Sequence, residues 1–191
     1  VVFQDFHLFS FELGQNVAAS TRYENEKVWD CLEKAGVEGA KVAICGDVMH
    51  SRVARSNIYG LTTMGAKVVL CAPPTLIPPR MDEMGCTIAP TIEDACENAD
   101  VVMGLRIQRE RQQKGLFPSV AEYCDHWEIT PQRLALAKKN ALVMHPGPMN
   151  RGVEIASSVA DCGQSVITQQ VESGVAVRMA LLYMLTRREN V

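Results

Sequence analysis

The segment "GDVMHSRVARSN", residues 46–57, follows a buried apolar run and opens a helical stretch. The free N–H groups and the dipole of a helix N-terminus favour anions. Arg52 lies in that first turn, where its guanidinium could hold a carboxylate or a phosphate through two parallel hydrogen bonds. The segment therefore predicts an anion site beside Asp47 and His50. The alternative is that Arg52 and Arg55 are solvated helix charges.

The segment "MGLRIQRERQ", residues 103–112, also begins with an apolar run. Arg106 and Gln108 follow that run two residues apart, so they share one side of an extended chain. A guanidinium and an amide together suit a ligand that carries carboxylates and an amine. The alternative is a charged loop, which the run 109–111 favours. Residues 113–128 are predicted to form a long loop of the kind that is used as a lid.

The segment "MHPGPMNRGVEI", residues 144–155, surrounds a glycine with two prolines directly after an apolar run. Proline fixes φ and glycine tolerates strained backbone, so this turn is expected to be rigid. Gly147 and Pro148 would then offer backbone carbonyls to a ligand at fixed positions. His145 is either a general base or, as is more common beside such a turn, a structural histidine that hydrogen-bonds the loop backbone.

These segments predict that the protein holds and orients anions, without covalent catalysis. No Ser-His-Asp order, paired carboxylates or cluster of metal ligands emerges. No Gly-x-Gly-x-x-Gly fingerprint or phosphate-binding P-loop is present either. The sequence accordingly predicts neither a metal nor a cofactor.

Each of the three segments follows a predicted strand in an alternation of strands and helices. Strands are expected at 41–47, 67–73, 86–90, 100–106 and 141–145. Helices are expected at 51–65, 79–85, 91–99, 130–140 and 164–190, with Thr91 and Thr130 as N-caps and Pro131 at a first helical position. Such alternation with short connections predicts an α/β fold: a doubly wound, mostly parallel, Rossmann-like sheet with a long C-terminal helix. The carboxyl ends of parallel strands are where such sheets hold ligands.

Composition narrows the class of protein further. The 191 residues are 47% apolar and 21% charged, with a net charge of −3, so no basic footprint for nucleic acid is present. No apolar run approaches the roughly 18 residues that a membrane span needs. The seven cysteines form no Cys-x-x-Cys pair, and several lie in strand-like apolar runs. This pattern argues against a zinc site or a disulfide framework and favours a reducing, cytoplasmic location.

The three segments together, in this order and approximate spacing, resemble the aspartate carbamoyltransferases. The stretch "QVESGVAVRMALL", residues 170–182, is also similar to the closing helix of that family. The resemblance covers residues 39–188 or so, which correspond to the second half of a family member. The ornithine branch of the superfamily carries His-Cys-Leu-Pro where this chain has His-Pro-Gly-Pro at 145–148, which favours aspartate as the acceptor.

The resemblance implies a role for each candidate residue. Arg52 and Arg106 would hold the carboxylates of aspartate, with Gln108 helping, and Gly147 and Pro148 would offer carbonyls to the amine of carbamoyl phosphate. The structural residues that would brace these loops are His145, Arg151 and Glu154. The implied reaction is direct attack of the aspartate amine on the carbamoyl carbon, with phosphate leaving and no metal or cofactor.

The first 40 residues depart from the family pattern. The family's Ser-Thr-Arg-Thr-Arg phosphate loop has only an echo in Ser20-Thr21-Arg22, and its His-Pro-Thr-Gln turn has no counterpart. We therefore expect residues 1–38 to be an incomplete remnant of the carbamoyl-phosphate domain and residues 39–191 to form the aspartate-binding domain with its closing helix. On this expectation the chain holds the aspartate half of the site.

Two other functions stay open at this point. One is a non-catalytic carbamoyltransferase-like binding or assembly subunit, and the other is a carbamoyltransferase for another amino acid. The partners that the resemblance implies are L-aspartate, carbamoyl phosphate and two further copies of the chain in a homotrimer, weakened here by the missing first domain. A regulatory or pathway-enzyme partner is also compatible with the resemblance.

Overall fold

A computed structural model describes residues 36–108 and 119–186 of the chain. The chain divides into a compact unit, Val37–Ser173, and a second unit that includes the residues from Gly174 onward. All described strands and all candidate site residues belong to the first unit. The predicted remnant over residues 1–38 lies almost entirely outside the described residues.

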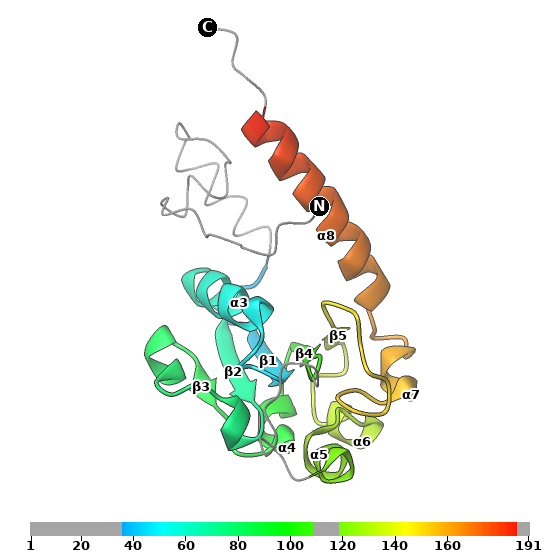
Figure 1. Ribbon diagram of the computed structural model, residues 1–191. Coiled ribbons are helices and arrows are strands. Elements are labelled where there is room, and N and C mark those ends of the chain that lie inside the picture. The colour runs from blue at the N-terminus through cyan, green and yellow to red at the C-terminus, as the bar shows by residue number, and fades with distance from the viewer. Residues whose placement is uncertain (1–35, 109–118, 187–191) are drawn as a thin grey trace, which may run out of the picture. The chain divides into compact units, whose positions relative to one another are not determined.

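The first unit is built on a parallel sheet of five strands. The strands are β1 (Lys41–Gly46), β2 (Lys67–Cys71), β3 (Thr87–Ile88), β4 (Val101–Leu105) and β5 (Leu142–Met144). Their order across the sheet is β3-β2-β1-β4-β5, and every pairing is parallel (Figure 1). In the centre, Ile44 of β1 is in register with Leu70 of β2 and Met103 of β4.

Helices cover both faces of this sheet. They are α3 (Arg52–Thr63), α4 (Ile92–Cys96), α5 (Val120–Trp127), α6 (Pro131–Leu134) and α7 (Ser157–Ala160), with 3₁₀ turns at Pro74–Leu76 and Met81–Met84. The last helix, α8 (Ile167–Thr186), begins in this unit and continues into the second one. Ile58 of α3 packs in one core cluster with Ile44, whereas α4, α6 and α7 contribute to a second cluster that contains Ala43. Because successive strand residues point to opposite faces, β1 is buried on both sides and reads as a continuous apolar run. The predicted doubly wound fold is confirmed.

The predicted helix starts at Thr91 and Thr130 are also confirmed. The hydroxyl of Thr91 accepts from the N–H of Asp94 at 3.1 Å, and that of Thr130 accepts from the N–H of Arg133 at 3.4 Å. Pro131 occupies the first turn of α6, where the missing N–H costs nothing. Side-chain oxygens thus satisfy helix N–H groups that have no partner within the helix.

The predicted lid loop over residues 113–128 is wrong where it can be compared. Val120–Trp127 form α5, and residues 113–118 lie outside the described residues. The Ser119 hydroxyl accepts from the N–H of Glu122 at 3.1 Å, which is the Ser-x-x-Glu start of a helix. Tyr123 then lies buried in a core cluster, and this burial anchors the helix to the sheet.

Other predicted elements exist but are shorter. The strand expected at 86–90 is reduced to β3, and the helix expected at 130–140 is reduced to the single turn of α6. The long C-terminal helix is present as α8, along which apolar side chains such as Val175, Met179 and Leu182 are exposed. Among the helices of the described part of the chain, none is long and apolar enough to cross a membrane.

The order of the strands creates a switch point between β1 and β4. The chain leaves β1 toward β2 and β3, and it then returns to the other side of β1 to form β4 and β5 (Figure 1). In such sheets a crevice opens above the carboxyl ends of the two strands where the direction reverses. Gly46 ends β1 with φ of +127°, and a Cβ there would lie 2.3 Å from the carbonyl oxygen of Leu105. The two strand ends therefore approach each other very closely.

Candidate functional site

A buried carboxylate joins the ends of β1 and β4. The Asp47 side chain has no exposed surface, and its oxygens accept from the backbone N–H of His50 at 3.1 Å and of Gln108 at 3.3 Å. They also lie 2.9 and 3.0 Å from Nδ1 of His50. Since a carboxylate only accepts hydrogen bonds, Nδ1 carries the proton that faces Asp47. The segment after β1 is thus held to the segment after β4.

Two amide side chains extend this network across the edge of the sheet. Gln108 donates from Nε2 to the carbonyl of His50 at 2.9 Å. Asn150, in the turn that follows β5, donates from Nδ2 to the carbonyl of Ile107 at 3.2 Å. The three segments selected from the sequence therefore meet at one edge, above β1, β4 and β5.

The two candidate arginines follow the neighbouring strands β1 and β4. Gly46 and Leu105 are in register, and Asp47 and Arg106 are the residues that directly follow them. Arg106 is half-buried, and Arg52 is exposed as the first residue of α3, whose N-cap is Ser51. A 12-residue helix adds the partial positive charge of its N-terminus to that of the guanidinium. Two guanidiniums and a helix N-terminus that follow these strands are suited to a small ligand with carboxylates.

The turn after β5 is held from inside by His145. The His145 side chain is fully buried, and its Nδ1 accepts from the N–H of Gly147 at 3.0 Å. Its own backbone N–H donates to Oε1 of Gln170 at 2.8 Å. Gly147 has φ of +64°, and the Gly147–Pro148 peptide bond is cis. Of the two predicted uses of His145, the structure supports the bond to loop backbone.

Glu154 and Arg151, which are predicted to brace this turn, lie in different surroundings. Glu154 is buried, and its Oε1 accepts from the N–H of Asn150 at 2.5 Å and lies 3.4 Å from Nε2 of His145. Arg151 is exposed and bonds the carboxylate of Asp161 at 2.6 and 2.8 Å. These bonds raise the pKa of Arg151 and lower the pKa of Asp161. Glu154 therefore braces the turn from the interior, whereas Arg151 ties it to α7 at the surface.

The described cysteines are free, and Cys45, Cys71 and Cys96 lie in one core cluster. Cys45 of β1 is in register with Cys71 of β2. Hydrogen bonds with Cys71 and Cys96, together with burial, raise the pKa of the Cys45 thiol well above its ordinary value. A buried thiol of this kind packs as a small apolar group. Within the described ranges, no three His, Cys, Asp or Glu residues are placed to hold a metal ion.

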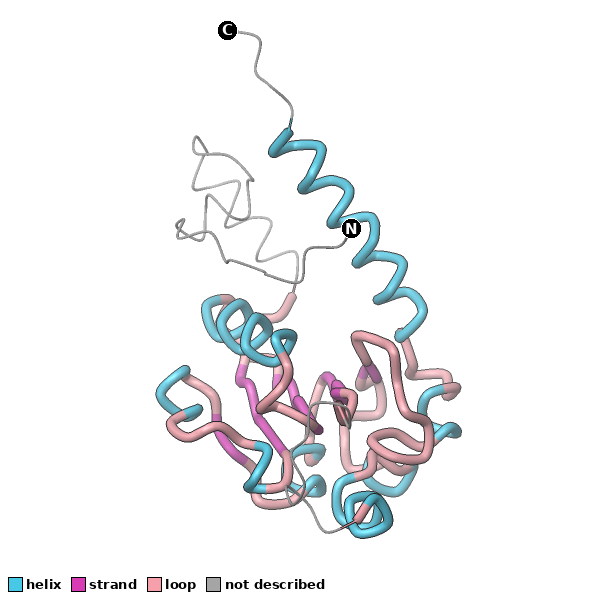
Figure 2. Tube along the Cα trace, in the orientation of Figure 1, coloured by secondary structure: helices cyan, strands magenta, loops and turns pink. Residues whose placement is uncertain are grey.

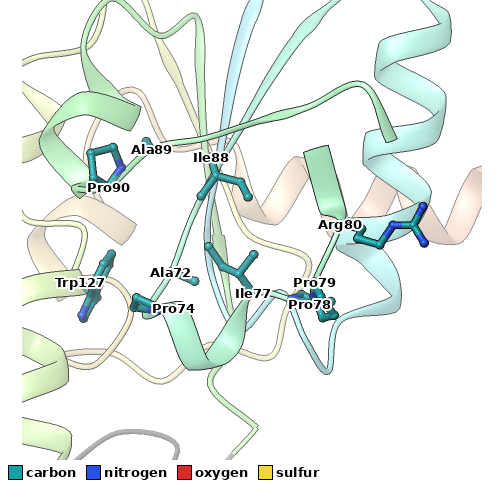
Figure 3. A pocket seen from close by; sticks show the side chains of 10 residues that line it. All are labelled: Ala72, Pro74, Ile77, Pro78, Pro79, Arg80, Ile88, Ala89, Pro90 and Trp127. Carbon is teal, nitrogen blue, oxygen red and sulfur yellow. The ribbon is translucent and has the colours of Figure 1, made fainter. Parts of the chain in front are cut away.

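A separate pocket of about 320 Å³ lies at the same edge of the sheet but above β2 and β3. Figure 3 shows Ile77 and Ile88 near its middle, Trp127 at one side and Arg80 with its side chain directed away. Four prolines complete much of the lining, namely Pro74, Pro78, Pro79 and Pro90. Arg80 is largely exposed and bonds Glu83 at 2.7 Å. No residue predicted from the sequence as a site residue lines this pocket.

Sequence reasoning placed Arg52, Arg106 and Gln108 at strand ends but missed the part that Asp47 plays. The signal available was a Gly-Asp pair directly after a buried strand, at the point where ligand sites form in α/β sheets. Asn150 carried no comparable signal, because its bond to Ile107 depends on β5 lying beside β4.

The fold defines a class, the doubly wound α/β domains, in which ligands bind at the switch point of the sheet. The family model described as "Aspartate/ornithine carbamoyltransferase, Asp/Orn binding domain" matches residues 38–185. The chain belongs to this family.

Individual relatives are similar over most of the chain. The aspartate carbamoyltransferase catalytic subunit of Ruminiclostridium cellulolyticum is 60% identical over 158 residues, which cover 82% of this chain and 50% of that protein. The catalytic subunit of Moorella thermoacetica is 61% identical over 155 residues, with coverage of 81% and 50%. The chain spans about half the length of the curated relatives it matches.

Solved structures share the fold at lower identity. Ornithine carbamoyltransferase from Pyrococcus furiosus matches with a TM-score of 0.67 and 24% identity, over 84% of this chain and 56% of that one. The enzyme of the same name from Burkholderia thailandensis matches with a TM-score of 0.65 and 23% identity, over 84% and 52%. These likenesses confirm the α/β fold.

Proposed function

We propose that residues 39–191 form the amino-acid-binding half of an aspartate carbamoyltransferase. The whole enzyme would transfer the carbamoyl group of carbamoyl phosphate to L-aspartate, giving N-carbamoyl-L-aspartate and phosphate in pyrimidine biosynthesis. Support comes from the family match and from relatives called aspartate carbamoyltransferase catalytic subunits at up to 61% identity. The assignment of residues 1–38 to the carbamoyl-phosphate domain stays a prediction.

One observation carries the proposal for the aspartate half-site: the Asp47 carboxylate holds the segments after β1 and β4 together. Arg52 and Arg106 follow these two strands, and each guanidinium would take one carboxylate of aspartate. Gln108 would contribute from the same strand end, with its amide held by the carbonyl of His50. Two carboxylates on a short ligand match two guanidiniums that follow adjacent strands.

The turn after β5 would supply the contacts to the second substrate, carbamoyl phosphate. Gly147 and Pro148 would offer backbone carbonyls to the amine of carbamoyl phosphate, with His145 and Glu154 holding the turn from inside and Arg151 from the surface. The amine of aspartate would then attack the carbamoyl carbon while the bond to the phosphate oxygen breaks. The proposed contributions of the protein are proximity, orientation and cationic stabilisation of developing charge.

The proposal favours aspartate over ornithine as the acceptor. Ornithine has a cationic side chain, which two neighbouring guanidiniums would repel. The His-Pro-Gly-Pro turn at 145–148 also differs from the His-Cys-Leu-Pro turn of the ornithine branch. We further propose a cytoplasmic location and the homotrimer that the resemblance implies.

Calorimetric titration of the chain with L-aspartate and with L-ornithine tests the proposal. We expect binding of L-aspartate alone, weakened about tenfold or more by Arg52→Ala or Arg106→Ala, because a bond between two charged groups is lost. Arg80→Ala is the matched control, since Arg80 is exposed over the other part of the edge. Tighter binding of ornithine would contradict the proposed substrate, and binding of neither ligand would favour a non-catalytic subunit.

A further inference from the structure

We propose that His50, held in place by Asp47, contacts the amine of the amino-acid ligand. The proposal rests on the proposed function, because it assumes that aspartate occupies the crevice between β1 and β4. Neither the family resemblance nor the motif analysis assigned a role to this histidine. Its geometry points to one.

The carboxylate behind His50 is unable to contact a ligand itself. Asp47 is fully buried, and its oxygens already accept from the backbone N–H groups of His50 and Gln108 and from Nδ1 of His50. A buried carboxylate with this set of donors fixes the ring that it holds, in the way that outer groups fix a histidine that acts on a ligand. Asp47 is therefore the positioning residue and His50 the presented one.

The orientation of the His50 ring follows from these bonds. Nδ1 lies 2.9 Å from one oxygen of Asp47 and 3.0 Å from the other, so this edge of the ring faces inward. Nε2 is on the opposite edge, and the side chain as a whole is 21% exposed. Because Nδ1 donates to Asp47, Nε2 is the ring nitrogen left to meet a ligand, and it lies on the edge turned away from the carboxylate.

The charges of an amino dicarboxylate indicate which ligand group would donate a hydrogen bond to Nε2 of His50. The two carboxylates are taken by Arg52 and Arg106 in the proposed site, which leaves an ammonium group in need of an acceptor. Asp47 and Glu154 are buried and already accept backbone N–H groups. Gln108 also offers an amide oxygen, but this oxygen is neutral and has no buried carboxylate behind it. His50 is the stronger acceptor because Asp47 stabilises any positive charge that develops on the ring.

Long-range ¹H–¹⁵N spectra of the histidine side chains test this contact in the full chain. The chain contains four histidines, and His50→Gln identifies the signals of His50. The ligands to compare are L-aspartate and succinate, which is the same dicarboxylate without the amine. We expect L-aspartate to shift the Nε2 signal of His50 and succinate to leave it in place, with Nδ1 protonated before and after binding.

A binding measurement complements the spectra. His50→Phe is expected to weaken L-aspartate about tenfold and to leave succinate within twofold, since only aspartate loses a bond to a charged group. His126→Phe is the matched control, because His126 is exposed on α5. The spectra of the unaltered chain carry the test if His50→Phe does not fold.

The outcomes separate this proposal from the proposed function. Equal shifts of His50 with both ligands, or no shift with either bound, would overturn the amine contact and leave the aspartate site standing. Failure of both ligands to bind would contradict the aspartate site and the contact together. A loss of aspartate binding that follows Gln108→Leu but not His50→Phe would assign the amine to Gln108 and overturn the proposal for His50.

Discussion

Two histidine–carboxylate pairs lie at the same edge of the sheet and differ in how they are built. In the pair after β1, Asp47 is buried and hydrogen-bonds Nδ1 of His50, whose side chain reaches the surface. In the pair after β5, His145 and Glu154 are both buried, and Oε1 of Glu154 lies 3.4 Å from Nε2 of His145. A histidine beside a carboxylate thus gives a partly exposed ring in one pair and an enclosed ring in the other.

The difference between the two pairs lies in which ring nitrogen of the histidine faces the carboxylate. His50 hydrogen-bonds the carboxylate through Nδ1, so Nε2 lies on the other edge of a partly exposed ring. His145 spends Nδ1 on the N–H of Gly147, so its second nitrogen faces Glu154 in the interior. Burial and the choice of ring nitrogen, more than residue type, would separate the ligand contact proposed for His50 from the structural support that His145 gives.

Each pair has a glycine beside it: Gly46 directly precedes Asp47, and Gly104 lies against His145. We expect substitution of these glycines to have the largest effect on stability. In Gly46→Ala the new Cβ would lie 2.3 Å from the Leu105 carbonyl oxygen at a φ of +127°, and backbone cannot move aside cheaply. We expect a loss of about 3 kcal/mol or more in the free energy of unfolding. In Gly104→Ala the Cβ would lie 3.0 Å from Cδ2 of His145, for an overpacking cost of about 1–3 kcal/mol.

Urea unfolding of the two glycine variants measures both values. A larger loss for Gly104→Ala than for Gly46→Ala would contradict the close approach of β1 and β4 at the switch point.

Removal of the enclosed carboxylate should have the next largest effect. Glu154→Ala takes away the acceptor of the Asn150 N–H and the group that faces His145. Buried donors without acceptors cost about 1–3 kcal/mol, and we expect a loss of about 2–3 kcal/mol in urea unfolding. Unchanged stability would mean that this pair does not support the turn.

A third pair, between Arg133 and Glu93, provides a pH dependence. Arg133 donates to Glu93 at 2.8 Å and to the carbonyls of Asp125 and Glu128. The hydrogen bond from Arg133 lowers the pKa of Glu93 below its ordinary 4.5. A lowered pKa in the folded state adds stability above the ordinary value, and this stability is lost as the pH falls through the folded pKa.

Arg133→Met should therefore cost about 1–2 kcal/mol at neutral pH, mainly through the lost hydrogen bonds. The difference from the unaltered chain should narrow as the pH falls below about 4.5, in urea unfolding at a series of pH values. A difference that grows toward acid pH would show that the sign of this linkage is wrong.

The smallest effect on stability is expected for Arg151, the other residue predicted to brace the turn. Arg151 and Asp161 are both exposed, and exposed ion pairs contribute little because water screens them. Arg151→Ala should leave the thermal midpoint nearly unchanged, in contrast with Glu154→Ala only three positions along the chain. A midpoint that falls as far as in Glu154→Ala would remove the distinction between interior and surface bracing.

The sequence predicted the fold well because its signals are local. Apolar runs marked the strands, and Thr130 followed by Pro131 marked a helix start that the structure contains. The missed helix α5 also had a local signal, the spacing of Ser119 and Glu122, but residues 113–118 before it favoured a loop. Figure 2 shows how much of the chain between β5 and α8 is loop, and such stretches carry little periodicity to interpret.

The site was predictable only in part, because its contacts join segments far apart in the chain. Arg52 and Arg106 could be placed at strand ends from local patterns. The bond between Asp47 and the N–H of Gln108 spans 61 positions and exists because β4 inserts beside β1. The presented nitrogen of His50 depends on this same bond network, so no local pattern indicates it.

The most direct test of the account is a map of backbone amide shifts as L-aspartate is added to the chain. We expect the largest shifts at residues that follow β1 and β4, around Arg52 and Arg106, and small shifts at the proline-lined pocket. Shifts concentrated at Ile77, Ile88 and Trp127 would contradict it. The ligand would then be held above β2 and β3, away from the switch point.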